Sequence, residues 1–488
     1  MDSSSVDIVL NKGGHNKSFE VKIYRIHTTK IMSFPNGSDA EGVLKRLEDY
    51  AKNDFEPHSR RMWGHIYYAG LKDVVELARK AYLMYMDKTM LDFTCFPSLL
   101  RMEREVVRMA SSLLNGDEEV VGNFTYGGTE SIMLALKAAR EKFRKEEGGN
   151  VVPEIVLPAT AHPAFWKSAE YLGMRCLRAK LDDELRADVE TVKELVGDKT
   201  AMIVGSAPNY PFGVVDDIKA LSDVAVDGKL WLHVDACLGG FHLPFFRELG
   251  EKIPDFDFSV EGVHSISADF HKYGLSPRGA SVILYRNAKL REGQIFVMAS
   301  WPGYPLVNTA VLSTRSAGTL AAAWAVMSYL GFDGYLKLAK KTLYAKKRLI
   351  EGLTELGLEL LGSPEGAVLA FTSERHNLFK VSTLMAEKGW YVQSQPGSKK
   401  LGFPRSLHFS VIPGHAEVVD EFLEDMREVL PECECSYPEM SSFDVSKLKF
   451  GEDGLPEDSE LISELIHSMP PEIVESVFKQ FINELIFR

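Results

Sequence analysis

The sequence has few cysteines, no long apolar run and no excess of basic residues. Its five cysteines among 488 residues are scattered and odd in number, which argues against a disulfide framework and suits reducing surroundings. The best candidate for a membrane span, Ala321 to Leu330, is about half of the roughly 20 residues needed and follows Arg315 closely, so we expect a buried helix there. The formal net charge of −13 indicates solubility and argues against a nucleic-acid-binding surface.

Targeting signals, repeats and metal-ligand patterns are also missing. The start, Met-Asp-Ser-Ser-Ser, has no basic segment and no apolar core, so we expect no secretory signal and a cytoplasmic location. Cys433 and Cys435 could begin a metal site, but no second pair follows them. We therefore interpret them as surface or packing residues and predict no metal site. What is present, 45% hydrophobic and 26% charged residues, is typical of a globular protein with a large core.

Length and periodicity indicate two or three domains. Residues 1–95 are expected to form an N-terminal arm with helices over 41–52 and 74–86. Residues 96–331 alternate short apolar runs with helices, which predicts an α/β catalytic domain around a largely parallel sheet. The strands expected in this domain are 154–157, 201–204, 230–234, 265–267 and 281–285.

Residues 332–488 are expected to form a smaller C-terminal α+β domain. A long helical stretch is predicted to begin near Tyr335, and strand-like segments at 367–372 and 406–411 alternate with helices. The tail from Cys433 onward holds an acidic loop, 451–460, and a final amphipathic helix, 471–487.

Three short segments carry candidate chemistry, and the first is a glycine-rich helix start. Gly127-Gly128-Thr129 leads directly into the apolar-periodic helix 132–140. Free N–H groups and the positive end of the helix dipole at such a start suit an anion, and a phosphate in particular. A simple capped turn is an equally good interpretation of this segment taken alone.

The other two segments each follow a predicted strand. Asp235 ends the run 230–234, where ligands bind in open α/β sheets, and its carboxylate could keep a heterocyclic nitrogen protonated, as an electron-sink cofactor requires. Lys272 follows the run 265–267, and a desolvated lysine forms Schiff bases. Taken alone, Asp235 could be an N-cap and Lys272 a solvated surface group. The three segments in this order indicate pyridoxal 5′-phosphate (PLP), bound to Lys272 as a Schiff base.

In these segments the sequence resembles the group II PLP-dependent decarboxylases and, within them, the sphingosine-1-phosphate lyases of the soluble microbial type. The matching segments are 127–131, 161–167, 206–211, 233–237 and 271–274, with weaker similarity at 63–70, 96–98 and 407–411 and at His415. They follow the family's order through most of the catalytic domain. The resemblance implies the PLP-dependent transferase fold of type I, which is aspartate-aminotransferase-like, with a large parallel or mixed sheet.

The resemblance also implies a role for each matching residue. Lys272 would carry the cofactor, Asp235 would pair with its pyridine nitrogen, and His162 would stack on its ring. The residues that would hold the cofactor phosphate are Gly128, Thr129 and His271. The presence of Lys272, Asp235 and His162 together argues against a non-catalytic binding protein.

Members of this family are homodimers whose active sites lie at the subunit interface. The resemblance therefore implies that the stretch Val311 to Gly318 reaches the partner's cofactor, with Thr314 near its phosphate. A monomer is not expected to work.

For the reaction, the resemblance favours cleavage of the Cα–Cβ bond of a phosphorylated long-chain amino alcohol, which gives phosphoethanolamine and a fatty aldehyde. Tyr67 and Arg278 match positions that these lyases place at the substrate, and Tyr210 matches one that we expect to serve the bond-breaking step. Arg278 stands where the lyases usually carry a lysine, and an arginine can bind a phosphate with two donors. A salt bridge in a loop is the alternative for Arg278.

Two departures leave an L-amino-acid decarboxylase open as the alternative. The lyases usually carry Asn-x-x-His before Phe96-Pro97, whereas this chain ends the corresponding segment with Asp92, and an aspartate beside a phosphate would repel it. Either Asp92 is turned away, or a residue such as His65 compensates, or the substrate is a different one. The segment Val311 to Arg315 is also less glycine-rich than in the lyases.

Overall fold

The structure, a computed structural model, describes residues 8–12, 19–23, 37–437 and 459–487. Most of the acidic loop expected at 451–460 lies outside the described residues. The helices are α1 (Ala40–Tyr50), α2 (Lys72–Tyr85), α3 (Pro97–Leu113), α4 (Gly128–Glu147), α5 (Ala164–Leu172), α6 (Val189–Leu195), α7 (Ile218–Asp227), α8 (Leu243–Glu248), α9 (Ala288–Glu292), α10 (Gly318–Glu355), α11 (Leu378–Glu387), α12 (Val419–Val429), α13 (Ser459–Ser468) and α14 (Pro471–Phe487).

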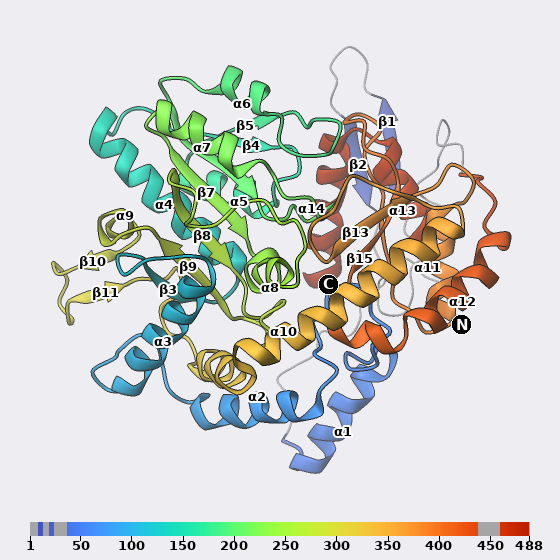
Figure 1. Cartoon of the computed structure of the whole chain (residues 1–488), viewed down its shortest axis with the longest axis horizontal. Coiled ribbons are helices and arrows are strands. Elements are labelled where there is room, and N and C mark those ends of the chain that lie inside the picture. Colours follow the sequence, from blue (N-terminus) through green and yellow to red (C-terminus); the bar gives the residue numbers. More distant parts are fainter. Residues whose placement is uncertain (1–7, 13–18, 24–36, 438–458, 488) are drawn as a thin grey trace.

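A seven-stranded sheet lies between layers of helices (Figure 1). Its strands, in spatial order, are β3 (Val121–Thr125), β9 (Ser281–Tyr285), β8 (Val263–Ala268), β7 (Trp231–Ala236), β6 (Thr200–Ser206), β4 (Glu154–Pro158) and β5 (Arg175–Ala179). The pairs from β8 to β5 are parallel, while β9 is antiparallel to both of its neighbours. The sheet is therefore mixed and largely parallel.

Both faces of this sheet are buried, which is why its strands appear in the sequence as short apolar runs. Successive side chains of a strand point to opposite faces. In β4, Ile155 and Leu157 join the cluster formed with α4 and α5, whereas Val156 joins the cluster on the other face, formed with α7. Two helical layers thus fix the sheet and the carboxyl ends of its strands.

The long helix α10 begins at Gly318, so the predicted start near Tyr335 is wrong. Helical geometry is interrupted at Gly331, whose φ of 56° and ψ of −175° are readily adopted only by glycine. The kink divides α10 into two segments: the buried helix expected at Ala321 to Leu330 lies in the first, and the helical stretch predicted from Tyr335 lies in the second. The first segment packs against α2 and α3, and the second reaches α12 in the C-terminal part (Figure 1).

The C-terminal part contains an antiparallel four-stranded sheet. Its strands, in spatial order, are β12 (Glu359–Leu360), β13 (Val368–Thr372), β15 (Ser406–Ser410) and β14 (Gln393–Gln395). Trp63, from the segment before α2, is completely buried in the core of this part, beside Phe409, Phe422 and His415. The residues that follow Trp63 contact both parts of the chain: His65 is hydrogen-bonded to Tyr391, and Tyr67 packs against Tyr273. Cys433 is buried in the same core and Cys435 is exposed.

Two hairpins complete the described chain. They are β1 (Ile8–Lys12) with β2 (Phe19–Ile23), and β10 (Phe296–Met298) with β11 (Leu306–Asn308). The second hairpin projects from the edge of the large sheet that carries β3 and α9 (Figure 1). No helix in the described ranges has both the length and the apolar character needed to cross a membrane.

Candidate active site

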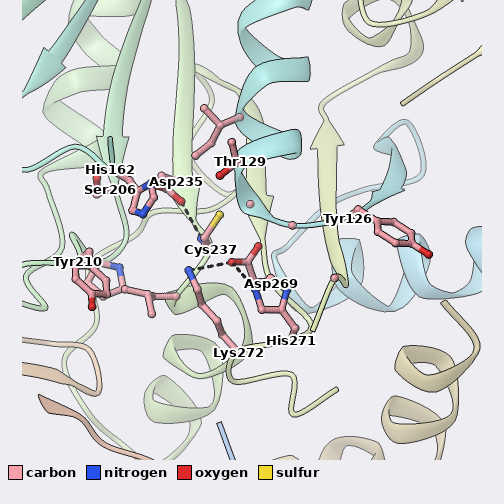
Figure 2. Close-up of a pocket in the computed structure, with 16 residues that line it drawn as sticks. Tyr126, Thr129, His162, Ser206, Tyr210, Asp235, Cys237, Asp269, His271 and Lys272 are labelled. Atoms are coloured by element: carbon pink, nitrogen blue, oxygen red, sulfur yellow. Dashed lines mark hydrogen bonds and ion pairs between the residues drawn. The ribbon is translucent and has the colours of Figure 1, made fainter. Parts of the chain in front are cut away.

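A cavity of about 280 Å³ lies where strands β6, β7 and β8 end and helix α4 begins. Figure 2 shows side chains from β6, β7, the start of α4 and the turn after β8 gathered at this cavity. Seven of the predicted site residues line it, namely Gly128, Thr129, His162, Tyr210, Asp235, His271 and Lys272. The position agrees with the rule that open α/β sheets bind ligands beyond the carboxyl ends of their strands.

The start of α4 forms one wall of the cavity. No side chain caps this end of the helix, and Gly127 has a φ of 134°, a conformation that favours glycine. A Cβ on Gly128 would lie 2.7 Å from Cys237 Sγ and 3.1 Å from Asp269 Oδ1, so a larger residue does not fit there. The first-turn N–H groups of a 20-residue helix thus meet the cavity directly, as an anion site requires.

Lys272 enters the cavity beside a buried aspartate. Its Nζ lies 2.9 Å from Oδ2 of Asp269, which is 1% exposed, and His271 Nε2 lies 3.7 Å from the same oxygen. Ser281 Oγ donates to the other oxygen of Asp269 at 2.6 Å. Burial alone would lower the pKa of Lys272, but the Asp269 carboxylate outweighs it, so the pKa is raised above its ordinary value. In this state Lys272 is an ammonium group.

Asp235 and His162 lie across the cavity from this pair (Figure 2). Oδ1 of Asp235 accepts hydrogen bonds from Cys237 N at 3.0 Å and Ser267 Oγ at 3.3 Å, while no residue of the described chain donates to Oδ2. Burial lowers the pKa of His162, mainly by desolvation, so its ring is neutral at neutral pH. A carboxylate oxygen with spare capacity and a neutral aromatic ring fit a protonated pyridine and its ring face.

These groups together match the parts of PLP. The amine of Lys272, the carboxylate of Asp235 and the open N-terminus of α4 would meet its aldehyde, its ring nitrogen and its phosphate. When bound, PLP supplies an electron sink for the bond that is broken at Cα. The roles of the individual residues remain predictions.

Tyr67 and Arg278, the predicted substrate residues, lie together next to the cavity but are not part of its wall. The ring of Tyr67 packs edge-on against Tyr273, with 5.1 Å between the centroids. The Arg278 guanidinium carbon is 5.9 Å from the Tyr67 ring centroid, and its side chain is exposed. The charge of Arg278 also contributes, after burial, to the lowered pKa of His65. The structure therefore brings a cation, an imidazole and a phenol together here.

Tyr210 is held on the opposite side by strands β14 and β15 of the C-terminal part. Its hydroxyl donates to Gln393 Oε1 at 2.9 Å, its ring stacks on His408 at 4.5 Å, and His408 Nε2 donates to its carbonyl oxygen at 3.0 Å. Burial raises the pKa of Tyr210, so the phenol is protonated at neutral pH. Residues far apart in the sequence thus fix this phenol at the cavity.

Asp92 is turned away from the cavity of its own chain. It is exposed, and its Oδ1 accepts hydrogen bonds from Thr94 N at 2.8 Å and Thr94 Oγ1 at 2.6 Å. These bonds lower its pKa, so it is an ordinary charged loop residue. Thr314 is also exposed and outside this cavity; its expected role concerns a partner chain and stays a prediction.

The sequence indicated no role for Asp269, which lines the cavity, or for Gln393, which accepts a hydrogen bond from Tyr210. Asp269 precedes Lys272 by three residues, a spacing that brings the two side chains together in the turn after β8. This three-residue spacing is the feature of the sequence that could have predicted the contact between Asp269 and Lys272. No such feature indicated Gln393, because it reaches Tyr210 from a strand 183 residues further along the chain.

Comparison with known proteins agrees with this site. Residues 42–362 match the pyridoxal-dependent decarboxylase conserved domain. The sphingosine-1-phosphate lyase of Arabidopsis thaliana is 39% identical over 80% of this chain and 71% of its own length. An L-aspartate/L-glutamate decarboxylase of Pyrococcus horikoshii is 33% identical over 82% of this chain and its full length.

A solved structure, the sphingosine-1-phosphate lyase of Burkholderia pseudomallei, superposes with a TM-score of 0.77 at 35% identity. The match covers 84% of this chain and 94% of that one. The predicted type I fold is thereby confirmed. Similarity of this extent shows that the chain belongs to the pyridoxal-dependent decarboxylase family and is a lyase that works with pyridoxal 5′-phosphate.

Proposed function

We propose that the protein cleaves the Cα–Cβ bond of a phosphorylated long-chain amino alcohol of the sphingosine-1-phosphate type, releasing phosphoethanolamine and a fatty aldehyde. The observation that carries this proposal is the position of Arg278 beside Tyr67 and His65, outside the cavity that holds Lys272. A guanidinium and an imidazole next to the cavity of the reacting amine suit a phosphate at the polar end of a substrate. Lyases of this type at up to 39% identity support the same reaction.

The bond cleavage needs a proton to leave the β-hydroxyl and another to reach Cα. As the Cα–Cβ bond breaks, the hydroxyl oxygen becomes the aldehyde oxygen, and the electron pair stays on the Cα side. Tyr210 lines the cavity and is protonated. Tyr210 can take up the hydroxyl proton only if its own proton, donated to Gln393 Oε1 in this structure, passes to Cα in the same step; one proton then moves from the hydroxyl to Cα and the phenol ends neutral. Gln393 accepts the phenol hydrogen bond and orients the hydroxyl.

An L-amino-acid decarboxylase is the second candidate. The similarity to an archaeal L-aspartate/L-glutamate decarboxylase over its full length favours it, and Arg278 could hold a carboxylate as well as a phosphate. Loss of CO₂ would leave no aldehyde, so the products separate the two reactions.

The deciding experiment supplies the PLP-loaded enzyme with phosphorylated dihydrosphingosine and, separately, with a panel of amino acids that includes aspartate and glutamate. The lyase proposal predicts a fatty aldehyde and phosphoethanolamine from the first substrate and little CO₂ from the panel. Release of CO₂ without aldehyde would overturn it and favour the decarboxylase.

We also propose that the working form is a homodimer with shared active sites. Large apolar side chains gather on the β10–β11 hairpin and the residues after it, where a soluble monomer rarely leaves so large an apolar patch. The exposed side chains are Phe296, Val297, Met298, Trp301, Tyr304, Val307, Val311 and Leu312. Light scattering should give about twice the 54.6 kDa mass of the chain, and a fully active monomer would refute the proposal.

A cytoplasmic location is the last part of the proposal. The scattered cysteines, all of them unpaired in the structure, suit a reducing compartment. Fractionation of cells that express a tagged full-length chain tests it, since recovery of the protein with membranes or in the medium would contradict a cytoplasmic location.

A further inference from the structure

Glu130, in the first turn of α4, accepts three backbone hydrogen bonds with one carboxylate. Its Oε2 accepts from Tyr126 N at 2.6 Å, directly before the glycine pair of the cavity. Its Oε1 accepts from Val311 N at 2.7 Å and from Leu312 N at 3.2 Å. These two residues begin the segment 311–316, which we call the strap. An acidic residue in a first helical turn normally serves the helix dipole, but here it also joins the cofactor-binding turn to the strap.

The other end of the strap is fixed as well. The hydroxyl of Tyr126 donates to Ser316 O, and Met90 N donates to Arg315 O at 3.0 Å. Tyr126 therefore contributes to both ends of the strap. Its backbone N–H donates to the same Glu130 carboxylate as the first residues of the strap, and its hydroxyl donates to the last residue. Between these anchors Thr314 is exposed, and its hydroxyl has no hydrogen-bond partner in the part of the chain that the structure describes.

The strap continues the apolar surface that we propose is covered by a second copy. Val311 is 48% exposed and Leu312 is 47% exposed, immediately after the apolar β10–β11 hairpin. Apolar side chains on an anchored backbone are suited to an interface, because little conformational freedom is lost when a partner covers them. Thr314 thus faces outward from its own chain, on the side where the partner would lie.

We infer that Glu130 is a positioning residue that acts across the subunit interface: by fixing the strap to its own cofactor-binding turn, it holds Thr314 where the partner's cofactor phosphate binds. The inference rests on the proposed dimer with shared sites. It means that one chain's cofactor affinity depends on a carboxylate that belongs to the other chain. A helix-dipole role would instead affect only the site of the chain that carries Glu130.

Glu130→Gln tests the inference with little change in size. An amide has one acceptor oxygen, so it cannot serve Tyr126 and the strap together, and its NH₂ group would face a backbone donor. Glu147→Gln is the matched control, because it makes the same charge change on α4 at an exposed position with no partner among the described residues.

The experiment uses heterodimers in which one chain carries Lys272→Ala and cannot bind the cofactor covalently. The fraction of intact Lys272 trapped with borohydride, against PLP concentration, then reports the site of the other chain alone. With Glu130→Gln added to the Lys272→Ala chain, we expect the PLP Kd at the unmodified chain's site to rise at least fivefold, with an unchanged Tm. When Glu147→Gln is added to the Lys272→Ala chain instead, the PLP Kd at the unmodified chain's site should stay within twofold of its value without either substitution.

The reverse arrangement separates the two roles of Glu130. If Glu130→Gln weakens PLP only in the chain that carries it, and not in the partner, the residue acts within its own chain and the inference fails. A chain that is monomeric by light scattering at the concentration of the assay also overturns it, because no interface would exist. The readout is trapped cofactor, and the assay contains no substrate. A finding that the enzyme acts on a substrate other than a phosphorylated amino alcohol would therefore refute the proposed reaction but leave this inference unaffected.

Discussion

Replacing Asp269 by asparagine tests how the protein controls the charge of Lys272. The two charged atoms are 2.9 Å apart, and at an effective dielectric constant of 20 such a pair attracts by about 6 kcal/mol. The Lys272 side chain is 19% exposed, so water screens part of this attraction, and we expect on the order of 3 kcal/mol to be lost in the variant. That energy corresponds to about a hundredfold shift of the ammonium equilibrium. Without the carboxylate the pKa of Lys272 falls, and the neutral amine forms at lower pH.

The assay measures the reactivity of Lys272 in the cofactor-free protein. Brief acylation between pH 6 and 10, followed by mass spectrometry of the Lys272 peptide, gives the neutral-amine fraction at each pH. For Asp269→Asn we expect labelling at neutral pH to rise by about a hundredfold. Ser281→Ala is the control, because it removes the 2.6 Å hydrogen bond to Asp269 but keeps the negative charge. If a folded Asp269→Asn variant labels like the wild type at every pH, Asp269 does not set the charge of Lys272.

Further predictions concern cofactor, substrate and stability. Lys272→Ala should lose the visible absorption of lysine-bound PLP; an unchanged spectrum would exclude it as the attachment site. Asp235→Asn should keep PLP but lose at least about a hundredfold in kcat, because an amide cannot hold the ring nitrogen protonated; wild-type turnover would refute this. Arg278→Ala should raise KM at least about tenfold for a phosphorylated substrate only, whereas Tyr210→Phe should lower kcat at nearly constant KM. Burial lowers the pKa of His415 to about 3, so below pH 6.5 only the unfolded chain gains this proton, and stability falls by about 1.4 kcal/mol per pH unit. His415→Gln should make the dependence of stability on pH shallower by about this amount, measured by urea unfolding at pH 5 and 7.

The sequence predicted those parts of the fold that depend on local burial. Strand β9 coincides with the predicted run 281–285, because a strand covered on both faces must be apolar throughout and is bounded by polar turns. Lys272 and Asp235 were placed in one cavity for the same reason: Asp235 lies near the end of one buried strand and Lys272 follows another, and parallel strands end at one edge of the sheet.

The parts that escaped prediction depend on contacts distant in sequence or on single backbone angles. Strand β3, Val121–Thr125, has a glycine and an asparagine in its interior and is a strand only because it pairs with β9. The helical stretches predicted at Ala321 to Leu330 and from Tyr335 were not joined into α10, because Gly331 interrupts the helical geometry between them. From the sequence alone, Glu130 is an acidic residue in the first turn of a predicted helix. No neighbouring residue in the sequence indicates that it accepts hydrogen bonds from Val311 and Leu312.

The ion pair between Lys272 and Asp269 has a protective effect on an enzyme whose proposed product is itself an electrophile. A fatty aldehyde condenses with a neutral amine. In a chain that has not yet bound PLP, the nitrogen of Lys272 lies in a cavity that is open to such an aldehyde. An ammonium nitrogen has no lone pair and cannot attack a carbonyl. By favouring this form, Asp269 slows the reaction of Lys272 with aldehydes such as the proposed product, and Lys272 must lose the same proton before it bonds to PLP.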